Sequence, residues 1–152
     1  MRETVLLHYE DFNIGQMFNL GPYPVTADEI IAFASEFDPQ PFHLSEDAAK
    51  ATILGGLCAS GWHSCAMLMR MMCDGYLNHS ASMGSNGISG VKWLKPVYAG
   101  ETLSGQMTVL TKRVSSKRPE MGILECRMEL CNETGERKVE QTGVHFMGVR
   151  KP

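Results

Sequence analysis

GGLCASGWHSCAMLMRMMCDGYL, residues 55–77, is the stretch around which the rest of this chain is expected to fold. Ser60-Gly61 can start a helix and Gly75 can end it. Between Trp62 and Cys73 nearly every residue is apolar or small, and Arg70 is the one charge. A helix that is apolar on all sides is typically buried, and a membrane span would need about 20 apolar residues. The stretch therefore predicts a central helix wrapped by other elements, with its methionines filling the core.

The start of this helix is also a candidate binding point. A helix N-terminus presents free backbone N–H groups and the positive end of the helix dipole. The pair Ser60-Gly61 allows a ligand to approach that end closely. We expect the Ser60 side chain to cap the helix, with lining a pocket as the alternative.

Composition indicates an ordinary globular protein of one domain, residues 1–152. Hydrophobic residues make up 43% and charged residues 20%, and the net charge is −3. This mild acidity argues against a nucleic-acid or membrane-surface partner. The first residues lack the apolar core of a signal peptide, and five cysteines without a C-x-x-C pair fit reduced thiols. We therefore expect a cytoplasmic protein.

The order of the other elements predicts an α+β fold. Thr26 and Glu29 form a capping box for a helix that ends before Pro39, and SEDAAKAT, residues 45–52, predicts a second, short helix. Strands are expected at residues 15–25, 88–97, 102–114, 121–132 and 137–150. Because the last four are joined by short connections, we expect them to form an antiparallel meander that wraps the central helix.

The loop DPQPFH, residues 38–43, holds the best candidates for catalysis. Its two prolines exclude a helix and stiffen the loop, so Asp38 and His43 should keep a nearly fixed relation. A carboxylate and an imidazole can share work on a water or a substrate proton. The alternative is that Asp38 closes the turn and His43 is an ordinary hydrogen-bonded residue. No histidine pair has metal-ligand spacing, so no metal site is predicted.

Three segments resemble the MaoC-like dehydratases, the family that includes the (R)-specific enoyl-CoA hydratases. They are FDPQPFHLSEDAAKA, GGLCASGWHS and VKWLKPVYAGETL, and the similarity covers nearly the whole chain. Asp38, Pro41 and His43 match the family motif, and Ala48 or Ala49 matches its alanine. Gln40 stands where the motif has Asn, and Phe37 where it often has Gly. The resemblance implies the hot-dog fold, in which a sheet wraps a long helix, and a homodimer or higher homo-oligomer.

The resemblance also implies a reaction and the residues that perform it. Asp38 and His43 would activate water for addition to an enoyl thioester or run the reverse dehydration, and the Gly61 N–H would bind the thioester oxygen. No metal or redox cofactor would be needed, because CoA or an acyl carrier arrives with the substrate. The expected pocket residues are Gln40, Phe42, Ser60 and Trp62. Lys92, Lys95, Arg113, Lys117 and Arg118 are candidates for the carrier phosphates.

Two other functions stay open at this stage. A hot-dog acyl-CoA thioesterase would need a carboxylate on the central helix, where Asp74 is the only acid and lies at the far end from Gly61. A non-catalytic acyl-thioester binding protein would not need both Asp38 and His43. We expect His63, on the first turn of the helix, to be structural rather than catalytic.

Overall fold

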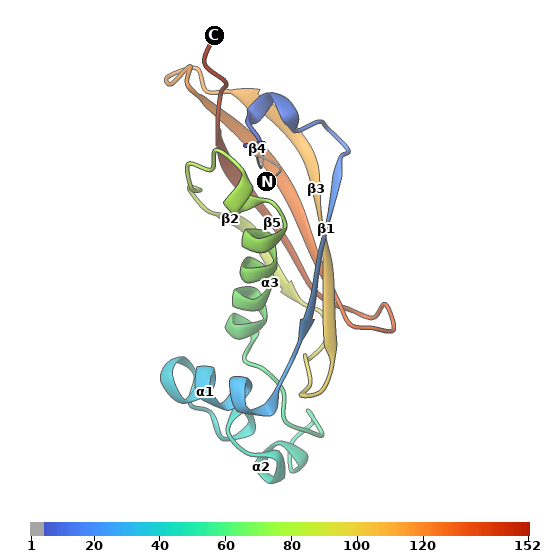
Figure 1. The fold of residues 1–152 in the computed structure, drawn as a ribbon. Helices are drawn as coiled ribbons and strands as arrows, with labels where there is room; N and C mark the ends of the chain where they lie inside the picture. Colours follow the sequence, from blue (N-terminus) through green and yellow to red (C-terminus); the bar gives the residue numbers. More distant parts are fainter. Residues whose placement is uncertain (1–4) are drawn as a thin grey trace.

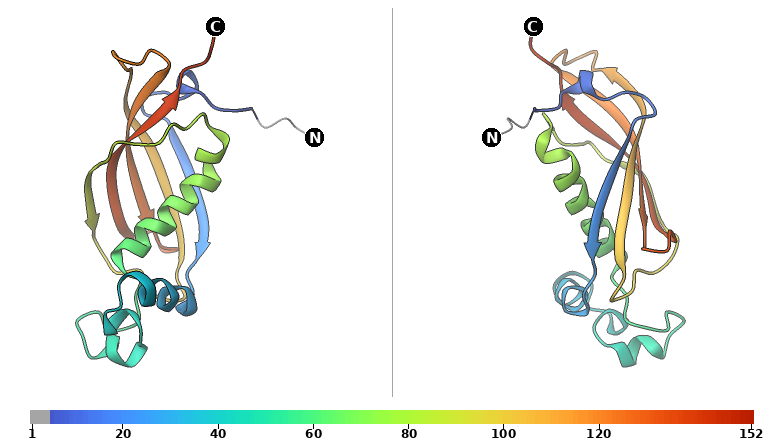
Figure 2. Two further views of the ribbon diagram at one scale, coloured as in Figure 1. Left: turned by 90° about the vertical axis from the view of Figure 1, so that its left-hand side faces the viewer. Right: turned by 45° about the vertical axis from the view of Figure 1, so that its right-hand side comes forward.

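A five-stranded antiparallel sheet curves around one long helix (Figure 1; Figure 2). The computed structural model describes residues 5–152. The helix, α3, spans Gly61–Gly75 and lies across the concave face of the sheet. The strands, in the order in which they lie in the sheet, are β1 (Met17–Pro24), β3 (Thr102–Val114), β4 (Met121–Cys131), β5 (Arg137–Gly148) and β2 (Ile88–Trp93).

Two helices are grouped at the N-terminal end of α3 (Figure 1). They are α1, Ala27–Phe37, and α2, Glu46–Lys50, and the single turn η2, Pro41–His43, lies between them in the chain. Two further turns, η1 (Tyr9–Asp11) and η3 (Leu77–His79), precede β1 and follow α3. The α+β class and the long central helix are therefore as predicted.

The core forms where the inward face of the sheet meets α3. Along β4, buried residues alternate with more exposed ones, as the period of two predicts. The inward residues of β4 are Leu124, Cys126, Met128 and Leu130, and each is at most 3% exposed. Burying a side chain of this size contributes about 1.5–3 kcal/mol, so this interface supplies much of the stability of the fold.

The predicted meander of four strands is wrong in one respect, because β2 does not lie beside β3. It pairs with β5 at the sheet edge opposite β1. The chain after β2 passes the start of α3, where Ala59 N–H donates to Val97 O (2.8 Å) and Ala99 N–H donates to Leu57 O (3.2 Å). Since these bonds are made to the segment before α3, the turn after Tyr98 belongs to a crossover from the edge strand β2 to β3 on the other side of the sheet, and it is not a hairpin.

The prediction that α3 is covered on most sides is also only partly met. Residues facing the sheet, such as Leu68 and Met72, are buried, but Trp62 is 61% exposed and Met69 is 47% exposed. Nothing in residues 5–152 covers this second apolar face. The sequence could not show this, because an apolar residue that faces a partner looks the same as one that faces the core.

The predicted cap of α1 is present, but its box is not closed. Thr26 Oγ1 accepts a hydrogen bond from Glu29 N–H (3.2 Å). The Glu29 carboxylate does not return to the Thr26 backbone and instead accepts from the Tyr23 hydroxyl. Sequence reasoning missed this alternative partner, which lies on β1.

A lysine is completely buried at the end of the sheet near α3's N-terminus. The Lys138 ammonium group lies 2.9 Å from Glu101 Oε1 and 2.7 Å from Glu136 Oε1, and it donates to Pro96 O at 2.8 Å. Its side chain is 1% exposed. Three oxygen acceptors therefore replace the water that the ammonium group loses on folding.

The five cysteines form no disulfide in the structure; Cys58 and Cys126 are buried, and Cys65, Cys73 and Cys131 are partly exposed. In the described part of the chain, no helix is long and apolar enough to cross a membrane.

Candidate active site

Asp38 and His43 lie together at the C-terminal end of α1. Asp38 is the C-cap of α1, and its N–H donates to Ala34 O (2.9 Å), while His43 ends η2. His43 Nε2 lies 3.5 Å from Asp38 Oδ2, and the two side chains are 9% and 19% exposed. The stiff proline loop thus brings together the two side chains that the sequence singled out.

Both side chains are held by further hydrogen bonds. His43 Nδ1 donates to the Cys58 carbonyl oxygen (2.7 Å), which leaves the proton on Nδ1 and directs Nε2 toward Asp38. Gln40 Nε2 donates to Asp38 Oδ1 (2.7 Å). Gln40 therefore still supplies an amide donor, although the family motif has Asn at this position.

The Ser60 hydroxyl lines the site rather than capping α3. Ser60 makes no side-chain capping bond, and its buried Oγ has no hydrogen-bond partner among the described residues. The Ser60 hydroxyl is nevertheless the largest influence on the pKa of the Asp38 carboxyl group, and it lowers that pKa. Burial opposes this effect, and Gln40 and His43 add to it, so the pKa of Asp38 is below its usual value.

These groups open into a cavity of about 310 Å³ at the N-terminus of α3. Its lining residues are Asp38, Gln40, His43, Ser60, Gly61, Trp62 and Trp93. Gly61 is the first residue of α3, where backbone N–H groups have no partner within the helix. The arrangement offers two proton acceptors, Asp38 and His43 Nε2, beside an N–H group at the positive end of a helix.

Trp93 is the lining residue that sequence reasoning missed. Its indole N–H donates to Gly61 O (2.9 Å), and its ring packs edge-on against Trp62 at 5.1 Å. A Cβ atom at Gly61 would lie 2.7 Å from the Trp93 ring, so only glycine fits this close approach. No local signal marked Trp93, because its contact with Gly61 depends on the pairing of β2 with β5, a strand distant in the sequence.

The other predicted site residues lie at different distances from the cavity. Phe42 packs edge-on against His43 (4.6 Å between ring centres) and does not line the cavity. Lys92 precedes Trp93 on β2, and Lys95 pairs with Glu136 (2.9 Å). Arg113, near the end of β3, and Lys117 and Arg118, in the turn between β3 and β4, are exposed. That turn lies at the sheet end remote from α1 and α2 (Figure 1).

A second cavity, of about 360 Å³, follows the exposed face of α3 toward β5. Trp62 lines both cavities. The second one is mostly apolar, with Cys65, Met69, Met72 and Met128 in its walls and Gln141 and His145 as polar members. Among residues 5–152, no cluster of three or more metal-ligating side chains is present.

Comparison with known proteins gives the family of this chain. The model of the MaoC like domain matches residues 11–124. An uncharacterized Bacillus subtilis protein, YdeM, is 32% identical over 125 residues, which cover 82% of this chain and 86% of that protein. The crystal structure of a MaoC-like dehydratase from Rhodospirillum rubrum is 37% identical, with a TM-score of 0.84 over 96% of this chain and 99% of that one. The chain therefore belongs to the MaoC-like dehydratase family.

A more distant structure supports the fold. The (R)-hydratase PhaJ1 of Pseudomonas aeruginosa, 19% identical, matches with a TM-score of 0.72 over 96% of this chain and 88% of its own. At this identity the likeness concerns the fold alone. The arrangement, a curved antiparallel sheet around one long helix, is the hot-dog fold.

Proposed function

We propose that this protein is a hydro-lyase that adds water reversibly to the double bond of an enoyl thioester. One observation carries this proposal: the Asp38 carboxylate and His43 Nε2, 3.5 Å apart, share one cavity with Gly61, the first residue of α3. Family membership supports the same class of reaction. The specific assignment is an enoyl-CoA hydratase or 3-hydroxyacyl-CoA dehydratase of the (R)-specific type.

In the hydration direction, Asp38 and His43 Nε2 bind one water molecule between them. Asp38 removes a proton as the water oxygen bonds to C3 of the substrate, and the electrons of the C2–C3 double bond move toward the thioester oxygen. The Gly61 N–H and the α3 dipole stabilise the resulting enolate. C2 then takes the proton back, so water is added without another reactant.

The magnitudes fit an enzyme that uses these groups alone. A positioned acid–base pair contributes about 10²–10⁴-fold in rate. One donor to the developing oxyanion contributes about 2.7–4 kcal/mol. The proposed reaction uses the chain's own groups, and CoA enters only as part of the substrate.

The catalytic cavity and the apolar cavity together support a path for the substrate, and the edge strand β2 supports a surface for a second copy of the chain. The acyl chain would extend from the catalytic cavity past Trp62 into the apolar one, with the carrier phosphates near Lys92 or Lys95. A second copy of the chain would cover the apolar face of α3 beside the unpaired edge of β2. Arg113, Lys117 and Arg118 are too remote to meet the carrier of a substrate bound in the same protomer.

The thioesterase alternative finds no support in the geometry. Asp74 is the only carboxylate of α3 and pairs with Arg70 (2.9 Å) one residue before the helix ends. It therefore lies at the opposite end of α3 from the Gly61 N–H and cannot activate water beside a thioester bound there.

The test is a panel of trans-2-enoyl-CoA substrates of increasing length, with one branched and one hydroxylated member. Hydration removes the ultraviolet absorbance of the conjugated thioester, and we expect this loss for at least one member. Chiral analysis should give the (R)-3-hydroxyacyl product. Release of free CoA thiol without loss of the double bond would support the thioesterase instead, and tight binding without turnover would support an acyl-binding protein.

Replacing Gly61 with Ala should impair turnover without unfolding the protein. The new Cβ would lie 2.7 Å from the Trp93 ring, so the indole must leave its place over the first turn of α3. Since misplacement by about 1 Å can cost 10²-fold, we expect kcat/KM to fall by about 10- to 100-fold in the enoyl-CoA assay. Gly90→Ala is the matched control, because its Cβ would meet nothing within 4 Å. Wild-type kcat/KM in Gly61→Ala would contradict the role of this turn.

A further inference from the structure

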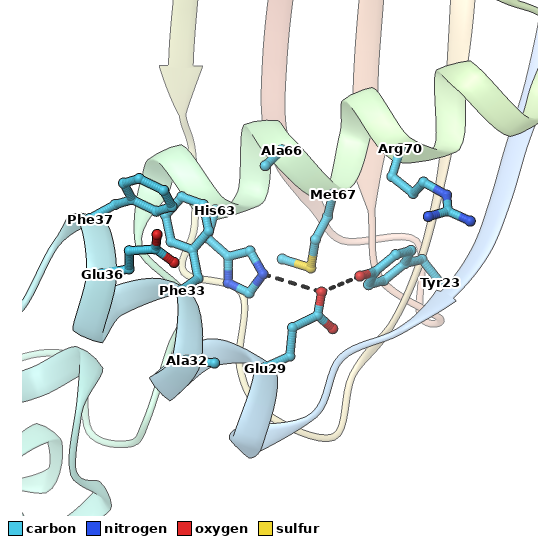
Figure 3. Close-up of a pocket in the computed structure, with 10 residues that line it drawn as sticks. All are labelled: Tyr23, Glu29, Ala32, Phe33, Glu36, Phe37, His63, Ala66, Met67 and Arg70. Atoms are coloured by element: carbon cyan, nitrogen blue, oxygen red, sulfur yellow. Dashed lines mark hydrogen bonds and ion pairs between the residues drawn. The ribbon is translucent and has the colours of Figure 1, made fainter. Parts of the chain in front are cut away.

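A third cavity, of about 380 Å³, lies where α1 and the end of β1 meet the first half of α3 (Figure 3). Tyr23, Glu29 and His63 come from these three elements and point toward one another in its wall. None of the three lines the catalytic cavity. The reaction proposed above therefore gives them no direct part.

One carboxylate joins the three elements. Glu29 Oε1 accepts from the Tyr23 hydroxyl and lies 3.5 Å from His63 Nε2. The His63 ring is stacked on Phe33 of α1, with ring centres 4.6 Å apart and planes at 8°. The network thus fixes α1 against the first turn of α3 by one polar and one aromatic contact.

The charge states are suited to a fixed arrangement. Burial lowers the pKa of His63, although the adjacent Glu29 opposes this, so the imidazole is neutral near pH 7 and Nε2–H can donate to Glu29. Burial and then Glu29 raise the pKa of Tyr23 to about 12, so its hydroxyl stays a donor. Arg70 and Glu36 also line the cavity, but Arg70 pairs with Asp74 (2.9 Å).

His63 is a costly choice for packing alone. Its side chain is 4% exposed, and its Nδ1 is buried without a hydrogen-bond partner among the described residues. A buried polar atom without a partner destabilises a fold. An aliphatic side chain would pack against Phe33 without this cost, which suggests that the imidazole serves something other than stability.

The network connects the two halves of the candidate active site. Glu29 and Phe33 lie on α1, which ends at Asp38. His63 lies two residues after Gly61 on α3. The contact between them therefore bears on the distance between the Asp38 carboxylate and the Gly61 N–H.

We propose that Tyr23, Glu29 and His63 are positioning residues that hold Asp38 and Gly61 in register for the reaction proposed above. The inference rests on that proposed function. It assigns Glu29 a role other than the helix cap, and it gives His63 a role in catalysis that is indirect.

The test compares Glu29→Ala, which removes the shared acceptor, and His63→Leu with wild type in the enoyl-CoA assay. Both should lower kcat by about 10- to 100-fold with KM changed far less, because bound substrate meets misplaced groups. His63→Leu should have an unchanged or higher Tm. His63→Gln, which keeps a side-chain N–H donor, should recover part of the lost kcat. Glu36→Ala is the matched control on the same helix and cavity and should match wild type.

A purely structural role predicts a different result. In that case His63→Leu would lower Tm, and the remaining folded protein would keep wild-type kcat, which would overturn the proposal. A second readout does not need turnover: in isotope-labelled protein, Glu29→Ala should shift the Gly61 amide and His43 imidazole resonances, and Glu36→Ala should not. Unmoved resonances would overturn the positioning role, whereas shifted resonances in a protein that hydrates no substrate would overturn only the proposed function.

Discussion

Asp38→Asn should lower kcat for enoyl thioester hydration by about 10²–10⁴-fold. The amide has the shape of the carboxylate and can still accept from Gln40, so the fold and substrate binding should persist. It cannot take the water proton, however, and one of its two positions becomes a donor facing His43 Nε2. Because the pKa of Asp38 is lowered, chiefly by Ser60, the wild-type carboxylate is ionised at neutral pH and ready to act as the base.

The measurement is kcat and KM by the loss of enoyl thioester absorbance, with Tm recorded for each variant. His43→Gln should show a loss of similar size, since its amide does not place an acceptor where His43 Nε2 holds the attacking water. Asp28→Asn, an exposed change in the first turn of α1, is the control and should leave kcat unchanged. If Asp38→Asn and His43→Gln both keep wild-type turnover, the assignment of the pair is wrong.

Lys138→Met should give the largest loss of stability, about 3–5 kcal/mol. The change keeps much of the side-chain volume but leaves the Glu101 carboxylate, 16% exposed, without the cation 2.9 Å away. At about 2–4 °C per kcal/mol for a chain of this size, Tm should fall by about 6–20 °C. Denaturant unfolding at pH 7 measures the free energy of unfolding directly.

The chain provides a matched control for this loss. Lys95 also pairs with Glu136, at 2.9 Å, but its side chain is 56% exposed. Solvent screens an exposed pair, so Lys95→Met should cost at most about 1 kcal/mol. Adding Glu101→Gln to Lys138→Met should recover part of the loss, because it removes the unpaired buried charge. Equal losses from Lys95→Met and Lys138→Met would show that burial of the pair is not the cause.

The helices and most strands could be predicted from the sequence, because their signals are local. The Thr26 cap and the proline after Asp38 set the bounds of α1, Gly61 and Gly75 bound α3, and alternating apolar residues mark β3 to β5. The proline-stiffened loop likewise predicted that Asp38 and His43 lie together. In each case the interacting residues are close in the chain, so spacing alone carries the geometry.

Pairings between distant segments were decided only by the tertiary structure. β2 joins the edge beside β5 and brings Trp93 over Gly61, 32 positions earlier in the chain. The Glu29 carboxylate contacts Tyr23 and His63 instead of closing the capping box, and Ser60 lines the cavity instead of capping α3. A side chain with several possible partners takes the one that burial and folding bring near, and local spacing does not contain that information. The sequence by itself thus determined most elements and the loop that holds Asp38 and His43, while only the folded chain brought Trp93 to the candidate site and determined the contacts that hold it.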